Sequence, residues 1–175
     1  FDFSFNNTKI KDIKISMLGE YQVYNAALAL TSVLILREKG LVQIRDEEIK
    51  AGLWNAKWPG RLEVIKRNPT ILIDGAHNLQ GISQLKKALD LFEFENLIIC
   101  IGILKDKDYS HMAEALGPIG DKIIVTEVDS PRKLDAERLE EEILKHNEKV
   151  YIEKDIEKSV KKALEFATEK DLIVF

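Results

Sequence analysis

The sequence predicts an α/β fold whose main part is a doubly wound, mostly parallel sheet of six strands with helices on both faces. In the C-terminal two thirds of the chain, short apolar runs alternate with amphipathic helical patterns. The runs are almost continuously apolar, as in "NLIICIG", which is typical of parallel strands buried on both faces. Within residues 80–92, the apolar residues Ile82, Leu85, Leu89 and Phe92 recur on one helical face.

The elements of this sheet follow one another along the chain. Strands are expected over residues 62–66, 71–74, 96–102, 122–128, 149–153 and 171–175. Helices are expected over residues 80–92, 110–116, 135–146 and 155–168.

A smaller region precedes the sheet. Residues 1–5 and 10–18 have strand-like patterns, and a long apolar helix is expected over residues 22–39, with Gly40 as its C-cap. A second helix is expected over residues 45–57. It has Asp46 as a plausible N-cap and places three apolar side chains on one face, namely Ile49, Leu53 and Trp54.

The stretch "WPGR" separates the two regions. Pro59 has no amide proton to donate, and Gly60 relaxes the backbone, so the helical pattern ends here. We therefore expect a domain boundary that divides residues 1–59 from residues 60–175.

Composition excludes several classes of partner. The 175 residues carry a net charge of −4 without a block of either sign, which predicts neither a nucleic-acid nor a membrane-surface footprint. The longest apolar run, "AALALTSVLIL", is too short for a membrane helix. The single cysteine, Cys100, is expected in the core and fits a reducing cytosol. Because the chain starts at Phe1 rather than Met, we expect it to derive from a longer protein.

The stretch "ILIDGAHN" places polar residues where a buried strand ends. Ligands of doubly wound sheets bind beyond the carboxyl ends of the strands. Gly75 would let a ligand approach the backbone, Asn78 could cap the next helix, and His77 would point into the crevice. The alternative is that Asp74 and Asn78 only cap the helix while His77 makes a local hydrogen bond.

Three further stretches carry candidate binding groups. In "WPGRLE", Arg61 could present its guanidinium to phosphate or carboxylate, or form an interdomain salt bridge with Glu63 or a neighbouring acid. In "LGEYQVYNAALAL", Asn25 could offer its amide to a base edge or cap the helix. The loop "ILKDKDY", residues 103–109, lies on the ligand side of the sheet or is simply a solvated charged loop.

These four stretches, in this order and spacing, resemble the second half of folylpolyglutamate synthase/dihydrofolate synthase, a member of the Mur ligase superfamily. The resemblance runs from about Leu18 to Phe175. It implies that residues 1–59 are the C-terminal end of the central Mur ligase ATPase domain. Residues 60–175 would then be the C-terminal, Rossmann-like glutamate ligase domain.

The resemblance also implies residue roles. Asn25 would contact the adenine, Arg61 the ATP phosphates, and Asp74 the ribose or nucleotide, while His77 would be the catalytic residue lining the acyl-phosphate region. The implied reaction transfers the γ-phosphate of ATP to a folate carboxylate, and the amino group of glutamate then attacks the acyl phosphate. Such chemistry depends mainly on positioning and charge neutralisation.

The sequence also departs from the family pattern. The P-loop, of the form G-x-x-x-x-G-K-[ST], is not found in this chain, and the Mg²⁺ ligands are expected mostly outside it. Tyr21 stands where the family often has His, and Leu79 where it usually has Pro, so neither receives a role. We therefore expect this fragment alone to be inactive.

The resemblance sets the expected cofactors and partners. The cofactors are ATP and Mg²⁺, and the partners are small molecules: ATP, glutamate, and folate or dihydropteroate. A cytoplasmic monomer without nucleic-acid or membrane partners is expected. Two alternatives are a non-catalytic nucleotide-binding module and a cell-wall Mur ligase; "DGAHN" and "LKDKD" favour the folate branch.

Overall fold

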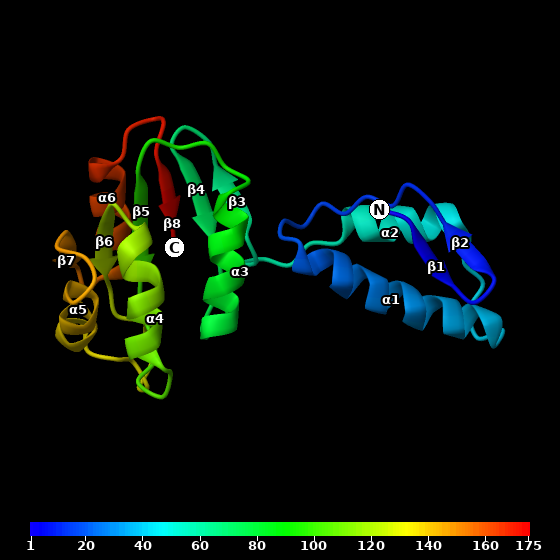
Figure 1. Cartoon of the computed structure of the whole chain (residues 1–175), viewed down its shortest axis with the longest axis horizontal. Helices are drawn as coiled ribbons and strands as arrows, with labels where there is room; N and C mark the ends of the chain where they lie inside the picture. The colour runs from blue at the N-terminus through cyan, green and yellow to red at the C-terminus, as the bar shows by residue number, and fades with distance from the viewer. The chain divides into compact units, whose positions relative to one another are not determined.

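The computed structural model describes all residues, 1–175, and the chain forms two compact units (Figure 1). Unit 1 comprises Phe1–Arg61 and unit 2 comprises Leu62–Phe175. The division falls within the "WPGRL" stretch, where Gly60 adopts a left-handed backbone conformation with φ of 71°.

Unit 1 is a hairpin packed on two helices. Strands β1 (Phe3–Phe5) and β2 (Thr8–Ile10) pair antiparallel and are followed by helices α1 (Tyr21–Glu38) and α2 (Asp46–Asn55). Both expected helices are therefore present, with ends displaced by one or two residues. The buried core of the unit consists of Ile10, Ile13, Leu30, Leu34 and Ile49.

Three expectations for unit 1 are wrong in detail. The strand expected over residues 10–18 is only Thr8–Ile10, because Asp12 has a left-handed φ of 56° that ends the extended run. Asp46 does not cap α2; Arg45 is the cap residue, and its amide donates to the Glu48 carboxylate at 2.8 Å. Trp54 is 52% exposed rather than buried beside Ile49.

Unit 2 contains the predicted six-stranded, mostly parallel sheet. Its strand order is β3-β4-β8-β5-β6-β7; β3 and β4 pair antiparallel, and all other neighbours are parallel. The predicted fold class is confirmed. The strands are β3 (Glu63–Lys66), β4 (Thr70–Ile73), β5 (Leu97–Ile101), β6 (Lys122–Val125), β7 (Val150–Ile152) and β8 (Leu172–Val174).

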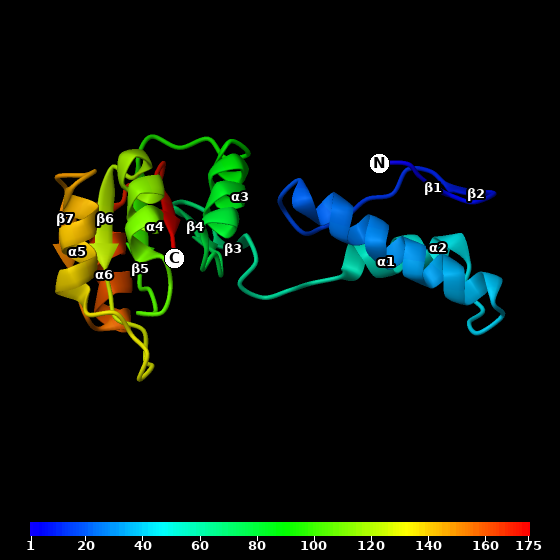
Figure 2. The ribbon, with the colours of Figure 1, turned by 60° about the horizontal axis from the view of Figure 1, so that its bottom comes forward.

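Helices cover both faces of this sheet (Figures 1 and 2). Helices α3 (Leu79–Leu89), α4 (Tyr109–Leu116) and α5 (Ala136–Leu144) pack side by side, and a short 3₁₀ turn follows α4 at Gly117–Ile119. Helix α6 (Ile156–Phe166) packs on the other face, where its Ala163 joins a buried cluster with strand residues Ile98, Cys100, Ile124 and Ile173.

Cys100 is a core residue, as the sequence predicted. It lies on β5 with 6% of its surface exposed, and this burial raises the pKa of its thiol to about 12. None of the helices is both long enough and apolar enough to cross a membrane.

Candidate nucleotide-binding site

The loop between β4 and α3 is organised by the carboxylate of Asp74. This carboxylate accepts hydrogen bonds from the amides of Leu62 and Ala76, each at 2.9 Å. The amide of Asp74 in turn donates to the carbonyl of Phe175 at 2.8 Å, at the end of β8. Asp74 therefore joins three segments that are distant in sequence. Asp74 does not cap α3, so the alternative in which both Asp74 and Asn78 only cap this helix is wrong for Asp74.

The bond from Leu62 fixes the backbone where unit 2 begins. Leu62 has a left-handed φ of 45°, which is unusual for a leucine, and its side chain is 2% exposed. A buried side chain and a bound amide hold this conformation. The Asp74 carboxylate therefore fixes the backbone of the first residue of unit 2, which follows Arg61 directly in the chain.

Helix α3 begins with the predicted cap. The Asn78 side chain accepts a hydrogen bond from the amide of Gly81 at 2.8 Å, and the Asn78 carbonyl accepts one from Ile82 at 3.0 Å. A Cβ atom at Gly81 would lie 3.2 Å from Ala76, so the loop packs tightly against the helix here. The first two helical amides, of Leu79 and Gln80, have no acceptor within the helix and can bind an anion.

His77 is exposed in the same loop. Its Nδ1 donates to the carbonyl of Gly75 at 2.9 Å, because a carbonyl oxygen can only accept. In the neutral imidazole this leaves Nε2 as an acceptor that can take a proton from a ligand. The structure thus contains the local hydrogen bond that was the alternative role for His77. It also leaves the second ring nitrogen, Nε2, available to a ligand.

Asn25 and Arg61 belong to unit 1. Arg61 is exposed, and its amide closes a turn onto the carbonyl of Trp58 at 3.3 Å. Asn25 lies beyond the first turn of α1 and does not cap it, so the capping alternative is wrong. Its Nδ2 donates to Oε1 of Gln22 at 2.9 Å. Asp74, His77 and Asn78 are thus brought together in one loop of unit 2.

The "LKDKD" loop is not simply solvated, because it pairs with the loop after β6. Leu104 and Lys133 form an antiparallel bridge, and the amide of Lys105 donates to the carbonyl of Arg132 at 2.8 Å. An ion pair of 3.4 Å between Arg132 and Asp106 adds to this pairing. The two loops therefore form one ordered platform at the carboxyl edge of the sheet.

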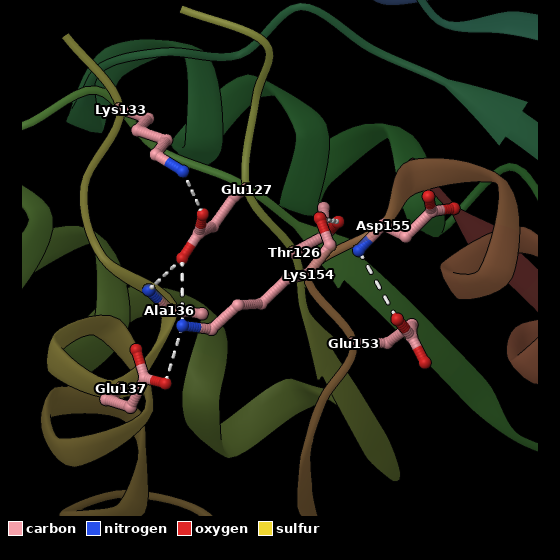
Figure 3. Close-up of polar contacts among 8 residues, drawn as sticks. All are labelled: Thr126, Glu127, Lys133, Ala136, Glu137, Glu153, Lys154 and Asp155. Carbon is pink, nitrogen blue, oxygen red and sulfur yellow. Dashed lines mark hydrogen bonds and ion pairs between the residues drawn. The ribbon is translucent and has the colours of Figure 1, made fainter. Parts of the chain in front are cut away.

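The platform is anchored by Glu127, whose side chain is only 9% exposed (Figure 3). Its carboxylate pairs with Lys133, lies 3.4 Å from Nζ of Lys154, and accepts from the amide of Ala136 at 3.3 Å. Lys154 also pairs with Glu137 at 2.7 Å. The hydrogen bonds from Lys133 and then Ala136 hold the pKa of Glu127 below its usual range.

A cavity of about 550 Å³ opens beside this cluster at the carboxyl ends of β6 and β7, rather than beside Asp74. Its charged lining is mixed in sign and includes Glu127, Asp129, Lys133, Lys154, Asp155 and Glu157. No group of histidine, cysteine or carboxylate side chains in the chain is arranged to hold a metal ion.

Sequence reasoning missed Glu127 because it extended the strand too far. The run "KIIVTEV" was expected to be a strand through Val128, but β6 ends at Val125. Thr126 and Glu127 lie beyond this strand, although their amides still donate to the carbonyls of Ile101 and Lys154 at 2.9 and 3.4 Å. The available signal was the acidic residue after the apolar run Ile123–Val125.

The sheet of unit 2 and the loop between β4 and α3 define the class of protein. It is a doubly wound α/β domain with its candidate ligand groups at the carboxyl edge of the sheet. The model for the Mur ligase, glutamate ligase domain, matches residues 60–175. The chain belongs to this family, which confirms the resemblance drawn from the motifs.

Individual proteins of this family are similar to the chain in sequence. The chain is 34% identical over 133 residues to dihydrofolate synthase/folylpolyglutamate synthase of Bacillus subtilis, covering 75% of this chain and 31% of that protein. It is 40% identical over 130 residues to the Mycobacterium tuberculosis protein of the same name, covering 73% and 27%. Two UDP-N-acetylmuramoyl-L-alanyl-D-glutamate–2,6-diaminopimelate ligases and a UDP-N-acetylmuramyl-tripeptide synthetase also match, at 27–30% identity.

A solved structure gives the same result. The structure of Mycobacterium tuberculosis folylpolyglutamate synthase complexed with ADP matches with a TM-score of 0.85 and 31% identity, covering 95% of this chain and 39% of that one. The chain thus spans less than half of the relatives it matches.

The Asp74 contact predicts a change in proteolysis. In Asp74→Asn, the side-chain NH2 group, which is a donor, would face one of the two backbone N–H groups. One hydrogen bond is then lost and a donor is left unpaired, which costs about 1–3 kcal/mol of local stability. Under native conditions, we expect trypsin to cleave Asp74→Asn after Arg61 roughly tenfold faster than it cleaves wild type. Mass spectrometry of timed digests measures the two rates. The control is Asn78→Asp, which keeps the helix cap. Equal cleavage in wild type and Asp74→Asn would contradict the assigned contact.

The Glu127 cluster predicts a pH effect. A carboxylate whose folded pKa is lowered stabilises the fold above its unfolded pKa, and this contribution is lost as the pH falls through the folded pKa. Glu127→Gln should therefore be less stable than wild type at pH 7 and lose less stability between pH 7 and pH 3. Urea midpoints followed by far-UV circular dichroism measure both effects, with the exposed Glu165→Gln as control. Parallel pH profiles for Glu127→Gln and wild type would rule the ion cluster out.

Proposed function

We propose that this chain is the C-terminal part of an ATP-dependent ligase that adds glutamate to folate, in folylpolyglutamate synthesis, dihydrofolate synthesis or both. The observation that supports this most is its similarity, along nearly the whole chain, to a folylpolyglutamate synthase whose structure contains ADP. Residues 1–59 are proposed as the end of the central ATPase domain, and residues 60–175 as the glutamate ligase domain.

Each candidate residue has a group suited to its proposed role. The Asn25 amide would contact the adenine, and the Arg61 guanidinium would neutralise charge on the ATP phosphates. Asp74 would act in two ways, as a nucleotide contact and through its hydrogen bonds to Leu62 and Ala76. The free amides at the start of α3 would add to the anion site.

The proposed reaction has two steps. A carboxylate oxygen of folate attacks the γ-phosphorus of ATP and ADP leaves, which gives an acyl phosphate. The amino group of glutamate then attacks the acyl carbon, loses a proton and expels phosphate, which leaves an amide. His77 would line this region and could take the proton on Nε2, since its Nδ1 donates to Gly75.

Mg²⁺, when bound, would neutralise charge on the phosphates during transfer. The chain has no carboxylate cluster suited to it, so its ligands are proposed to lie mostly outside residues 1–175. The partners are proposed to be ATP, glutamate, and folate or dihydropteroate, with the enzyme acting as a cytoplasmic monomer. The one buried, unpaired cysteine agrees with a reducing compartment.

Kinetics of the complete enzyme test the assignment of Arg61. Removing a charge that stabilises the transferred phosphoryl group costs a few kcal/mol, so we expect Arg61→Ala to lower kcat by roughly 10²–10³-fold with little change in Tm. Asp74→Ala should mainly raise the KM for ATP. Arg67→Ala, at an exposed arginine without a proposed role, is the control.

Three outcomes would count against the proposal. Near-normal ligation by both Arg61→Ala and Asp74→Ala would make these residues structural. A complete protein that binds ATP but forms no glutamylated product would instead be a nucleotide-binding module, and one that adds an amino acid to a nucleotide-linked precursor would be a cell-wall ligase. The present chain alone should form neither ADP nor product, since it has no P-loop.

A further inference from the structure

Helix α1 carries large apolar side chains on the side that faces away from the core of unit 1. Its buried residues Leu30 and Leu34 pack with the hairpin and α2, which lie together on one side of the helix (Figures 1 and 2). On the opposite side, the helical period brings Tyr24, Leu28 and Ile35 into one stripe. Tyr24 and Leu28 are 71% and 69% exposed, so neither is covered by unit 1.

The same side of α1 carries no charge. None of residues 21–36 is an acid, a base or a histidine. A helix that faces water on one side normally has charged residues there, whereas a helix that is apolar all round is normally buried. The stripe and the two hydroxyl residues beside it therefore have the composition of a buried surface. We call it the outer face of α1: Tyr24, Leu28, Thr31, Ser32 and Ile35.

The two hydroxyl groups of the outer face form hydrogen bonds within α1. Oγ1 of Thr31 donates to the carbonyl of Ala27 at 2.9 Å, and Oγ of Ser32 donates to the carbonyl of Leu28 at 3.0 Å. Burying a hydroxyl group is costly where its proton has no acceptor. Because both protons have an acceptor in the helix, an apolar surface can cover the outer face and leave neither of them unpaired.

The size of the outer face indicates what kind of partner covers it. The 18 residues of α1 make it about 27 Å long, and at a width of about 10 Å the face offers roughly 300 Å². A stable interface between separate proteins buries about 800 Å² on each partner. A segment of the same polypeptide needs less area, because the chain already holds it nearby. The face also lacks the Lys and Arg residues that hold an amphipathic helix on a membrane surface.

We propose that the remainder of the complete ligase packs on the outer face of α1 through an apolar, uncharged surface of its own. This rests on the proposed function, in which residues 1–59 are the end of a larger central domain. The folylpolyglutamate synthase structure with ADP supports this occupant, since its match covers 95% of this chain but only 39% of that one. A charged group opposite the outer face would be buried without a partner, so the covering surface is apolar.

The reactivity of a single thiol tests this contact. Ser32→Cys places a thiol of similar size on the outer face, and Cys100 does not compete because burial raises its pKa to about 12. We expect N-ethylmaleimide to modify position 32 at least tenfold more slowly in the complete enzyme than in the present chain, measured by peptide mass spectrometry. Leu91→Cys, at a leucine of unit 2 that is 62% exposed, is the control and should react equally in both.

Leu28→Glu gives a second, independent readout. In the present chain the side chain at position 28 is exposed, so this substitution should change Tm by no more than about 2 °C. In the complete enzyme the new carboxylate would be buried without a partner, and Tm should fall by about 5 °C or more. Leu91→Glu, the matched control, should leave Tm nearly unchanged in both proteins.

The outcomes separate this inference from the proposed function. Equal reaction rates at position 32 in the complete enzyme and the present chain, or an unchanged Tm for Leu28→Glu in the complete enzyme, would overturn the inference. Protection that disappears when the complete enzyme is diluted would identify a second copy as the occupant, which would also overturn it. Protection that persists in a complete protein unable to form glutamylated folate would support the inference and overturn the proposed function.

Discussion

The pairing of β8 with both β4 and β5 is the constraint on which unit 2 depends. β8 is the last strand in the chain, yet it lies inside the sheet, and Leu172 and Ile173 at its start are fully buried. The hairpin of β3 and β4 joins the rest of the sheet only through it. The start of the strand is held by Asp171, which is 2% exposed. Burial opposes ionisation of Asp171, but hydrogen bonds from Thr168 and Asn96 outweigh it and hold the pKa of its carboxyl below the usual range.

This pairing places the candidate loops on one edge. The amide of Asp74 bonds to the end of β8, so the loop that follows β4 is tied to the same sheet that carries the "LKDKD" platform. Two carboxylates then order the loops from within: Asp74 binds the amides of Leu62 and Ala76, and Glu127 binds Lys133 and the start of α5. Because these loops are ordered before a ligand binds, less conformational entropy is lost when the ligand is bound and positioned. This ordering agrees with the proposed phosphoryl transfer, which depends mainly on positioning and charge neutralisation.

The sequence predicted the sheet because its signals are local and repeated. Apolar runs and helical periods identified all six strands of unit 2, and the Asn78 cap followed from residue type alone. The contacts that organise the site are not local. The Asp74 carboxylate accepts a hydrogen bond from Leu62, which lies twelve residues away in the chain. Glu127 forms ion pairs with Lys133 and Lys154, which lie in two different loops. The sequence pattern therefore identifies the elements, and only the fold identifies which polar side chains work together.

In the proposed reaction, the complete enzyme activates a folate carboxylate as an acyl phosphate before glutamate is added. The most direct measurement uses a folate labelled with ¹⁸O in the reacting carboxylate and follows the phosphate released during one turnover by mass spectrometry. Because formation of an acyl phosphate places one carboxylate oxygen in the phosphate, we expect one ¹⁸O atom per molecule of phosphate released with the glutamylated product. Glutamylated folate formed together with unlabelled phosphate would contradict it.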